Sequence, residues 1–292
     1  MLLSNETNKV YFSNCLESHC GDFFKRIKAV LEQYSIEVGV LQNTKDYWCR
    51  DYMPLQVAEG RFVKYRYFPN YLNKPNVCSY RTEMEKPWSH LGIDDKFLVD
   101  LSDITLDGGN MVKTPYHVIM TDKIFTENKN LKRNVLIRRL EDAFQNEVLI
   151  VPRYDPEKDP CGHTDGMVRY IKGCELLTDN YSKFNAPFAE RLYNILEQKG
   201  YNVNELGLPY VSDYSWAYIN FLQTSKVIII PKLNLLSDAS AQEYLSSFFD
   251  IPVLQVKAPT LIKKYGGAYN CMSWNIKGKI NFCTDYPKYM LR

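Results

Sequence analysis

Amphipathic stretches with helical spacing alternate along the chain with short runs rich in β-branched residues. Each of four such stretches is followed directly by a run that favours a strand. The four pairs of segments are residues 21–35 and 36–41, 130–145 and 147–152, 185–200 and 201–208, and 238–250 and 251–256. This alternation predicts a protein of the α/β class.

The helix-like segments recur with a period of about 54 residues, provided that one position in the series, 82–101, is degenerate. Five units of mixed helix and strand predict a repeat architecture that closes on itself as a single domain spanning residues 1–292, because an isolated unit cannot bury its own apolar face. Helix and strand also alternate in an ordinary α/β sheet, and the period alone does not choose between the two.

A polar segment follows each unit and carries a side chain capable of chemistry. The five segments contain "YWCRDYMP", "LDGGNM", "CGHTDGMVRY", "SWAYINFL" and "YGGAYNC". One residue from each, namely Asp51, Asp107, His163, Asn220 and Cys271, gives successive gaps of 56, 56, 57 and 51 residues. In a ring of five units these residues would lie at a similar height and face a common axis. The spacing therefore favours a ring with one central pocket.

Composition and charge narrow the classes of partner. The 292 residues are 45% hydrophobic and 24% charged, and 36 basic against 34 acidic residues give a net charge of +2. No basic run is present, so we expect no nucleic-acid partner. The N-terminus lacks the basic flank and apolar core of a signal peptide, and the longest apolar run, "VIIIP", is too short to cross a membrane. We expect a soluble, cytoplasmic protein without a membrane partner.

The spacing of the cysteines indicates reduced thiols, because it matches neither a disulfide framework nor a metal site. No C-x-x-C pair occurs among them. Cys271 differs from the other seven because it stands directly behind a glycine-rich polar segment. The eight positions are 15, 20, 49, 78, 161, 174, 271 and 283.

Cys271 and His163 form a candidate catalytic pair, since an imidazole can lower the pKa of a thiol and serve as a general acid and base. His163 lies in a glycine-flanked motif that also carries an acid, whereas the other three histidines fit surface or packing positions. Asp107, in a tight "DGG" turn, could hold the His163 ring in one orientation. An Asx-turn is the competing interpretation of Asp107.

Asp51 and Asp165 indicate a cationic substrate, because hydrolysis of an ordinary ester or amide has no use for extra carboxylates beside the nucleophile. A guanidinium group fits, since its planar fork of N–H donors matches carboxylates bidentately. A thiolate could attack the guanidinium carbon, ammonia would leave, and water would release a ureido product from the covalent thiouronium. Alternatively, Asp51 pairs with the neighbouring Arg50, and Asp165 caps the following turn.

Four motifs resemble those of guanidino-modifying enzymes, within the branch of agmatine deiminases and bacterial peptidylarginine deiminases. The motifs occur in the family's order and span residues 36 to 275. They are W-x-R-D-x-x-P at 48–54, D-G-G-N at 107–110, G-H-x-D-x-x-x-R-Y at 162–170, and the glycine-rich run that ends in Cys271. The resemblance implies the pentein fold, a five-bladed, pseudo-symmetric α/β propeller with a central active site.

The resemblance also implies roles for individual residues. Cys271 would be the nucleophile, His163 the general acid and base, and Asp107 the carboxylate partner of the histidine. The substrate-binding residues implied by the resemblance are Asp51 and Asp165 as the guanidinium clamp, Trp48 lining the channel, and Asn220 contacting the substrate.

The chain departs from agmatine deiminases in ways that leave the substrate open. Its last motif reads "GGAYNC", so Asn270 stands where those enzymes usually carry a histidine, and the tryptophan- and proline-rich start is missing. Agmatine, arginine, an arginyl peptide or another small guanidine are all candidates. We expect selectivity for the substrate's tail to lie in the irregular segments 64–87 and 154–160. Arg169 could meet a carboxylate of the substrate, but a buried ion pair that supports its loop is the favoured interpretation.

The sequence leaves three alternative interpretations open. Amidino transfer would use the same thiouronium with an amine in place of water. A catalytically silent propeller could bind partners instead, and a metal site could form on His163, Asp165 and nearby cysteines, although no second ligand pair at zinc spacing appears. For that reason we expect no metal. We also expect no organic cofactor, because no nucleotide-binding fingerprint occurs. A homodimer stays open, since the sequence does not determine the oligomeric state.

Overall fold

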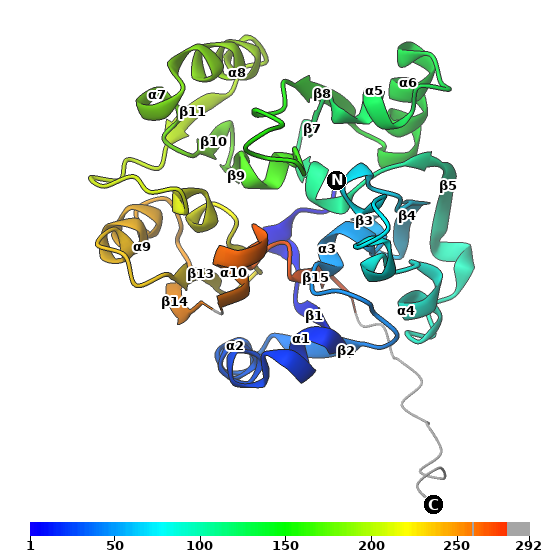
Figure 1. The fold of residues 1–292 in the computed structure, drawn as a ribbon, viewed down its shortest axis with the longest axis horizontal. Coiled ribbons are helices and arrows are strands. Elements are labelled where there is room, and N and C mark those ends of the chain that lie inside the picture. The colour runs from blue at the N-terminus through cyan, green and yellow to red at the C-terminus, as the bar shows by residue number, and fades with distance from the viewer. Residues whose placement is uncertain (259, 279–292) are drawn as a thin grey trace, which may run out of the picture.

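Five three-stranded sheets are arranged in a ring around a common centre (Figure 1). The computed structural model describes residues 1–258 and 260–278. In spatial order the sheets are β15–β1–β2 (Ser273–Ile276, Lys9–Ser13, Glu37–Leu41), β3–β4–β5 (Leu55–Ala58, Arg61–Arg66, Leu98–Thr105), β6–β7–β8 (Val112–Lys113, His117–Thr121, Glu147–Val151), β9–β10–β11 (Val168–Lys172, Glu175–Thr178, Asn202–Glu205) and β12–β13–β14 (Leu222–Gln223, Ile228–Lys232, Val253–Lys257).

Every sheet has the same pairing pattern. The first strand runs antiparallel to the middle strand, and the middle strand runs parallel to the third. A parallel pair needs a crossover connection, and helical segments supply it in each unit. The predicted five-bladed α/β propeller is therefore confirmed, and each predicted helix and following run forms the second half of a blade.

The α-helices lie on the outside of the ring, except for the short α3 and α10 near its centre (Figure 1). They are α1 (Asn14–His19), α2 (Gly21–Gln33), α3 (Cys49–Tyr52), α4 (Glu85–Ser89), α5 (Lys123–Glu127), α6 (Arg133–Phe144), α7 (Tyr181–Phe184), α8 (Ala186–Gln198), α9 (Asp238–Ser246) and α10 (Thr260–Tyr265). Seven 3-10 turns accompany them in the described residues: η1 (Ser4–Glu6), η2 (Asn70–Leu72), η3 (Cys78–Tyr80), η4 (Asp95–Phe97), η5 (Gly108–Asn110), η6 (Thr164–Gly166) and η7 (Ser215–Tyr218).

The long outer helices each bury one apolar stripe against their own sheet. In α2 the stripe includes Phe23, Ile27 and Leu31, which are four residues apart and therefore share one face. The helices α6 and α8 bury residues with the same spacing. Burial of each such side chain contributes about 1.5–3 kcal/mol, so these stripes hold the blades together.

The second blade has the degenerate helix that the sequence predicts. Between β4 and β5 the crossover contains α4, which is five residues long, together with three 3-10 turns. Residues 64–87 begin at the end of β4 and are irregular up to α4. The weak repeat signal at 82–101 thus reflects a real shortening of this helix.

The ring closes because the first and last strands of the described residues share one sheet. The strand β15 pairs with β1 through the register Tyr11 to Trp274 and Phe12 to Ser273. This pairing removes the open edge that the first and last units would otherwise expose. It also places Cys271, immediately before β15, beside segments from the start of the chain.

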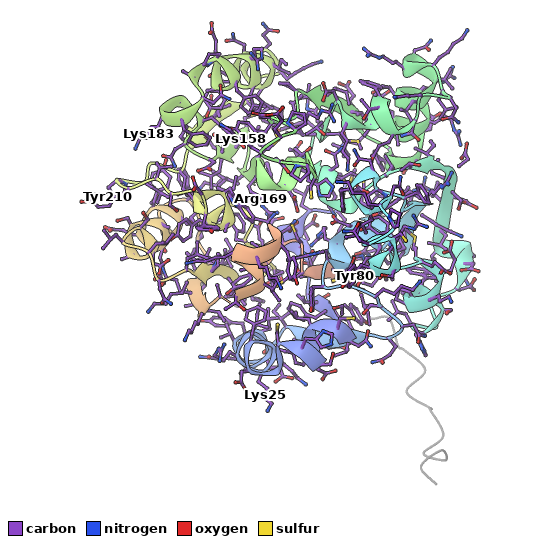
Figure 2. The ribbon with its side chains drawn as sticks, in the orientation of Figure 1. Lys25, Tyr80, Lys158, Arg169, Lys183 and Tyr210 are labelled. Atoms are coloured by element: carbon purple, nitrogen blue, oxygen red, sulfur yellow. The ribbon has the colours of Figure 1, made fainter. Side chains whose placement is uncertain are left out.

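The innermost strands β3, β6, β9, β12 and β15 begin directly after the polar turns. Figure 2 shows Arg169 of β9 near the centre of the ring, whereas Lys25, Lys183 and Tyr210 lie at its periphery. No helix of the described residues has the length and apolar character needed to cross a bilayer. Seven cysteines are free thiols, and Cys283 lies outside the described residues.

Candidate active site

The five polar turns meet at the centre of the ring. Asp51 lies in α3, Asp107 precedes η5, and His163 and Asp165 flank the start of η6. Asn220 follows η7, and Cys271 precedes β15. All six side chains of this set are buried, with Cys271 the most exposed at 8%. The structure therefore brings together residues that are more than 200 positions apart in sequence.

Gly109 marks the point where three of these side chains converge. A Cβ atom at this position would lie 2.7 Å from both Asp51 Oδ1 and His163 Nδ1, and 3.3 Å from Asp165 Oδ1. The Gly109 amide also donates a hydrogen bond to Asp51 Oδ1 at 2.9 Å. The second glycine of the D-G-G-N motif is thus required by close packing of the site.

We expect Gly109→Ala to lower the turnover of the protein's substrate about 100-fold, because the added methyl group displaces Asp51 and His163 by a fraction of an ångström or more. Gly166→Ala is the matched control, since nothing lies within 4 Å of its added Cβ. Steady-state kinetics and thermal unfolding of both variants check this. Equal activity of the two variants would contradict it.

His163 is held between two carboxylates. Its Nε2 lies 2.9 Å from Asp107 Oδ2, and its Nδ1 lies 3.6 Å from Asp51 Oδ1. Burial by itself lowers the pKa of His163, but Asp51 and Asp107 outweigh it and raise the pKa to about 9. The ring is therefore protonated at neutral pH and can act as an acid. The Asp107 carboxylate forms a hydrogen bond with the His163 ring and does not form the competing Asx-turn.

Lys123, at the start of α5, is a site residue that sequence reasoning missed. It is 1% exposed, forms ion pairs with Asp107 and Glu127, and lies 3.4 Å from His163 Nε2. Burial tends to raise the pKa of Asp107, but Lys123 and His163 lower it to about 2. The available signal was the i, i+4 pair of Lys123 and Glu127. No motif points to it, because the segment "TDKIFTE" reads as an ordinary helix start.

Cys271 faces a carboxylate across the site. Its Sγ donates to Asp165 Oδ2 at 3.5 Å, and its backbone N–H donates to Asn220 Oδ1 at 3.3 Å. Burial, followed by the charges of Asp165 and Asp51, raises the pKa of the thiol well above its usual range. In the absence of a ligand the thiol is therefore protonated.

Two asparagines connect the separate turns that carry Asp165 and Cys271. Asn220 Nδ2 donates to the Asp165 carbonyl at 3.2 Å. Both the nitrogen and the oxygen of the Asn220 side chain therefore form hydrogen bonds within the protein. Asn270 Nδ2 donates to Asp165 Oδ2 at 2.6 Å. The carboxylate of Asp165 therefore faces Asn270 and Cys271 and does not cap η6. Sequence reasoning left the role of Asn270 open.

Arg50 does not pair with its neighbour Asp51. Its guanidinium donates to the Asn270 carbonyl, at 3.3 Å from Nε, and to the Asn275 side chain. Tyr65 fixes the turn of Asp51 by donating to the Asp51 carbonyl at 2.9 Å. Trp48 packs on Gly267, where a Cβ would lie 2.3 Å from the indole. The plain ion pair predicted as the alternative for Asp51 is wrong.

Comparison with known proteins identifies the family. Residues 15–276 match the family described as Porphyromonas-type peptidyl-arginine deiminase. The chain belongs to this family. A comparison with the sequences of curated proteins finds no match.

Solved structures of deiminases and related enzymes share the fold. Agmatine deiminase of C. jejuni aligns with a TM-score of 0.72 at 17% identity, covering 92% of this chain and 93% of the other. Agmatine deiminase of Enterococcus faecalis gives 0.68 at 18% identity, with 94% of each chain covered. DDAH from Pseudomonas aeruginosa, solved with citrulline, gives 0.62 at 12% identity, with 93% of this chain and 100% of the other covered. The fold of this family member is thus the pentein propeller.

The segment 64–87 covers the site of this deiminase-family chain. Tyr71 lies edge-on to the His163 ring with centroids 5.9 Å apart, and Lys123 Nζ lies 5.0 Å from the Tyr71 ring centre. The segment 154–160 ends beside His163, because Asp159 Oδ1 accepts from the amides of Cys161 and Gly162. Within the described residues, no three His, Cys, Asp or Glu side chains are grouped so as to hold one metal ion.

Proposed function

We propose that the protein hydrolyses the guanidinium group of a small or peptidyl substrate to a ureido group and ammonia, with Cys271 as the nucleophile. The observation that carries the proposal is a buried thiol facing Asp165, with Asp51 and a protonated imidazole on the same site. Among the described residues, neither Asp51 nor Asp165 forms an ion pair with a lysine or arginine. A guanidinium would supply the missing cation and bond both carboxylates.

Binding of the cation would activate the thiol. The carboxylates raise the pKa of Cys271, so a guanidinium between them cancels part of that effect and favours the thiolate. The thiol proton leaves to solvent as the substrate binds. Asn220 positions the nucleophile through its bond to the Cys271 amide, and Trp48 lines the path of the substrate.

The thiolate then attacks the guanidinium carbon, forming a C–S bond. His163 transfers its proton to the departing nitrogen, which leaves as ammonia when the C–N bond breaks, and a thiouronium remains on Cys271. A water molecule next gives a proton to neutral His163 and attacks the same carbon. Collapse of this adduct breaks the C–S bond and releases the ureido product, and the hydroxyl proton passes to the departing sulfur, which restores the Cys271 thiol. Asp107 orients the imidazole through both transfers.

The substrate class is the arginine and agmatine type, and its tail is the open question. Relatives of this fold are named as agmatine deiminases, and the family is named for peptidyl-arginine. Tyr71 places residues 64–87 over His163, which supports selection of the tail by this segment. We also propose that residues 1–292 form a single catalytic domain. The proposed location is the cytoplasm, where thiols stay reduced. Light scattering would test the homodimer.

A guanidine panel tests the proposed function. Ammonia and ureido product are measured with agmatine, arginine, methylated arginines and arginyl peptides, with and without an added amine. We expect one member to yield both products in equal amounts without the amine. Ammonia formation that is absent unless an amine is added, together with amidine transfer to that amine, would favour the amidinotransferase. Absence of turnover with every member would overturn the proposal.

The pH profile of kcat/KM is expected to be bell-shaped. Asp51 must be ionised, and burial raises its pKa to about 6, so activity falls as the pH drops through about 6. His163 must be protonated, so activity falls as the pH rises through its pKa of about 9. Because the charge of Lys123 lowers the pKa of His163, Lys123→Met should move the alkaline limb to higher pH. The exposed Lys172→Met should leave it in place, and equal profiles of the two variants would contradict the role of Lys123.

A further inference from the structure

A second cluster of charged side chains lies beside the turns that carry the catalytic groups. Arg50, Lys113 and Arg169 line one small cavity of about 30 Å³ together with Gln223 and Asn270. Lys113 lies on β6, Arg169 on β9 and Gln223 on β12, so the innermost strands of three sheets contribute, and Leu55 of β3 adds a fourth. Figure 2 places Arg169 near the centre of the molecule.

The three cations of this cavity bond only neutral acceptors among the described residues. Arg50 donates to the Asn270 carbonyl and the Asn275 side chain, and Arg169 donates to the Phe221 carbonyl at 3.2 Å. Lys113 donates to the Gln56 carbonyl at 3.0 Å. The buried ion pair predicted for Arg169 is therefore not formed with any described carboxylate. Its guanidinium lies 4.4 Å above the Phe221 ring instead.

Buried cations without an ion-pair partner are costly, and the pKa values of Lys113 and Arg169 reflect that cost. Burial lowers the pKa of Lys113 to about 7, with Arg50 adding to the effect and Glu6 opposing it. Burial also lowers the pKa of Arg169 to about 10, although Asp165 acts in the opposite direction. Asp165 itself bonds Asn270 and Cys271. Both arginines are more than nine-tenths buried, at 8% and 6% exposure.

We propose that this cavity binds a small monovalent inorganic anion, with chloride as the occupant. Two guanidinium groups and one amino group, from α3, β6 and β9, bring N–H donors and positive charge to one cavity, which is the environment that an anion requires. The volume is large enough for one small ion. Anion binding at this cavity is a separate property and does not depend on the proposed deiminase activity.

The anion would also steady the nucleophile's turn. The Arg50 amide donates to the Cys271 carbonyl at 3.1 Å, and the Arg50 side chain donates to the Asn270 carbonyl. Asn270 lines the cavity and at the same time bonds Asp165. An ion that fixes the Arg50 guanidinium would therefore also fix the backbone of Asn270 and Cys271.

Thermal unfolding in sodium chloride, with sodium gluconate keeping the ionic strength constant, tests the anion site. We expect Tm to rise with chloride and reach a plateau, because a ligand that binds only the folded state stabilises it. Lys113→Met should weaken the apparent chloride affinity about tenfold, which corresponds to the loss of one charge-assisted hydrogen bond. The exposed Lys172→Met is the matched control. Equal effects of chloride and gluconate on the native protein would overturn the proposal.

Bromide replaces chloride in a direct test that does not require any variant to fold. Crystals of the native protein grown in sodium bromide should show an anomalous scattering peak within hydrogen-bond distance of the Arg50 and Arg169 guanidinium groups. A map with bromide peaks only at the surface would overturn the site, as would an unchanged chloride dependence in a folded Lys113→Met protein.

Discussion

Cys271→Ser is expected to lower guanidine turnover at least about 1,000-fold while leaving the fold intact. A serine hydroxyl is close in size to the thiol, and it can still donate to Asp165. The serine hydroxyl stays protonated at the pH at which a bound guanidinium converts the cysteine thiol into a thiolate, so the variant lacks a nucleophile. Ammonia release by the native and variant proteins measures the effect on the best member of the guanidine panel.

The control for Cys271→Ser is Cys174→Ser, which changes an exposed thiol in the turn between β9 and β10. Mass spectrometry of the acid-quenched native enzyme should also show the covalent thiouronium on Cys271, and the variant should lack it. A variant that keeps turnover within a few-fold of the native value would exclude Cys271 as the nucleophile.

Asp165→Asn is expected to have the second largest effect, a loss of turnover of about 100-fold or more. Asparagine keeps the shape and an oxygen that can accept from Asn270, so the turn should survive. The substitution removes one of the two charges that would bind the guanidinium. Steady-state kinetics should therefore show a higher KM and a lower kcat.

The Cys271 thiol in Asp165→Asn separates an electrostatic role from a structural one. Since Asp165 raises the pKa of Cys271, the variant thiol should become reactive toward iodoacetamide at lower pH than the native thiol, although turnover falls. Asp103→Asn, which alters an exposed carboxylate paired with Arg139, is the control. Loss of turnover with an unchanged reactivity profile would mean that Asp165 acts only by holding the turn.

The repeat pattern could be predicted because it depends on local spacing. The helix predicted from residue 238 begins at Asp238, and the one predicted from residue 185 begins at Ala186. In contrast, the first strands of the blades escaped prediction. Two of them, β6 and β12, are only two residues long, which is too short for any alternation of polar and apolar positions.

The candidate site could be predicted where a side chain belongs to a motif with unusual neighbours. Glycines beside Asp107 and His163 reveal a crowded turn, and the even spacing of five turns indicates a common axis. Lys123 escaped because a lysine at a helix start is normally solvent-exposed, and only the packing around Asp107 and Glu127 buries it. Arg169 lies inside a motif, yet its partner is Phe221, which directly precedes β12 of the next blade.

The sequence by itself determined the α/β class, the number of repeating units, the family and the candidates for the reactive side chains, since these depend on residue types and their spacing along the chain. Only the tertiary structure decided how the ring closes through β1 and β15, which carboxylate faces His163 and which faces Cys271, and that three cationic side chains line one cavity. These features depend on contacts between residues more than 50 positions apart. Such contacts are governed by packing and burial in the folded chain, which no local pattern encodes.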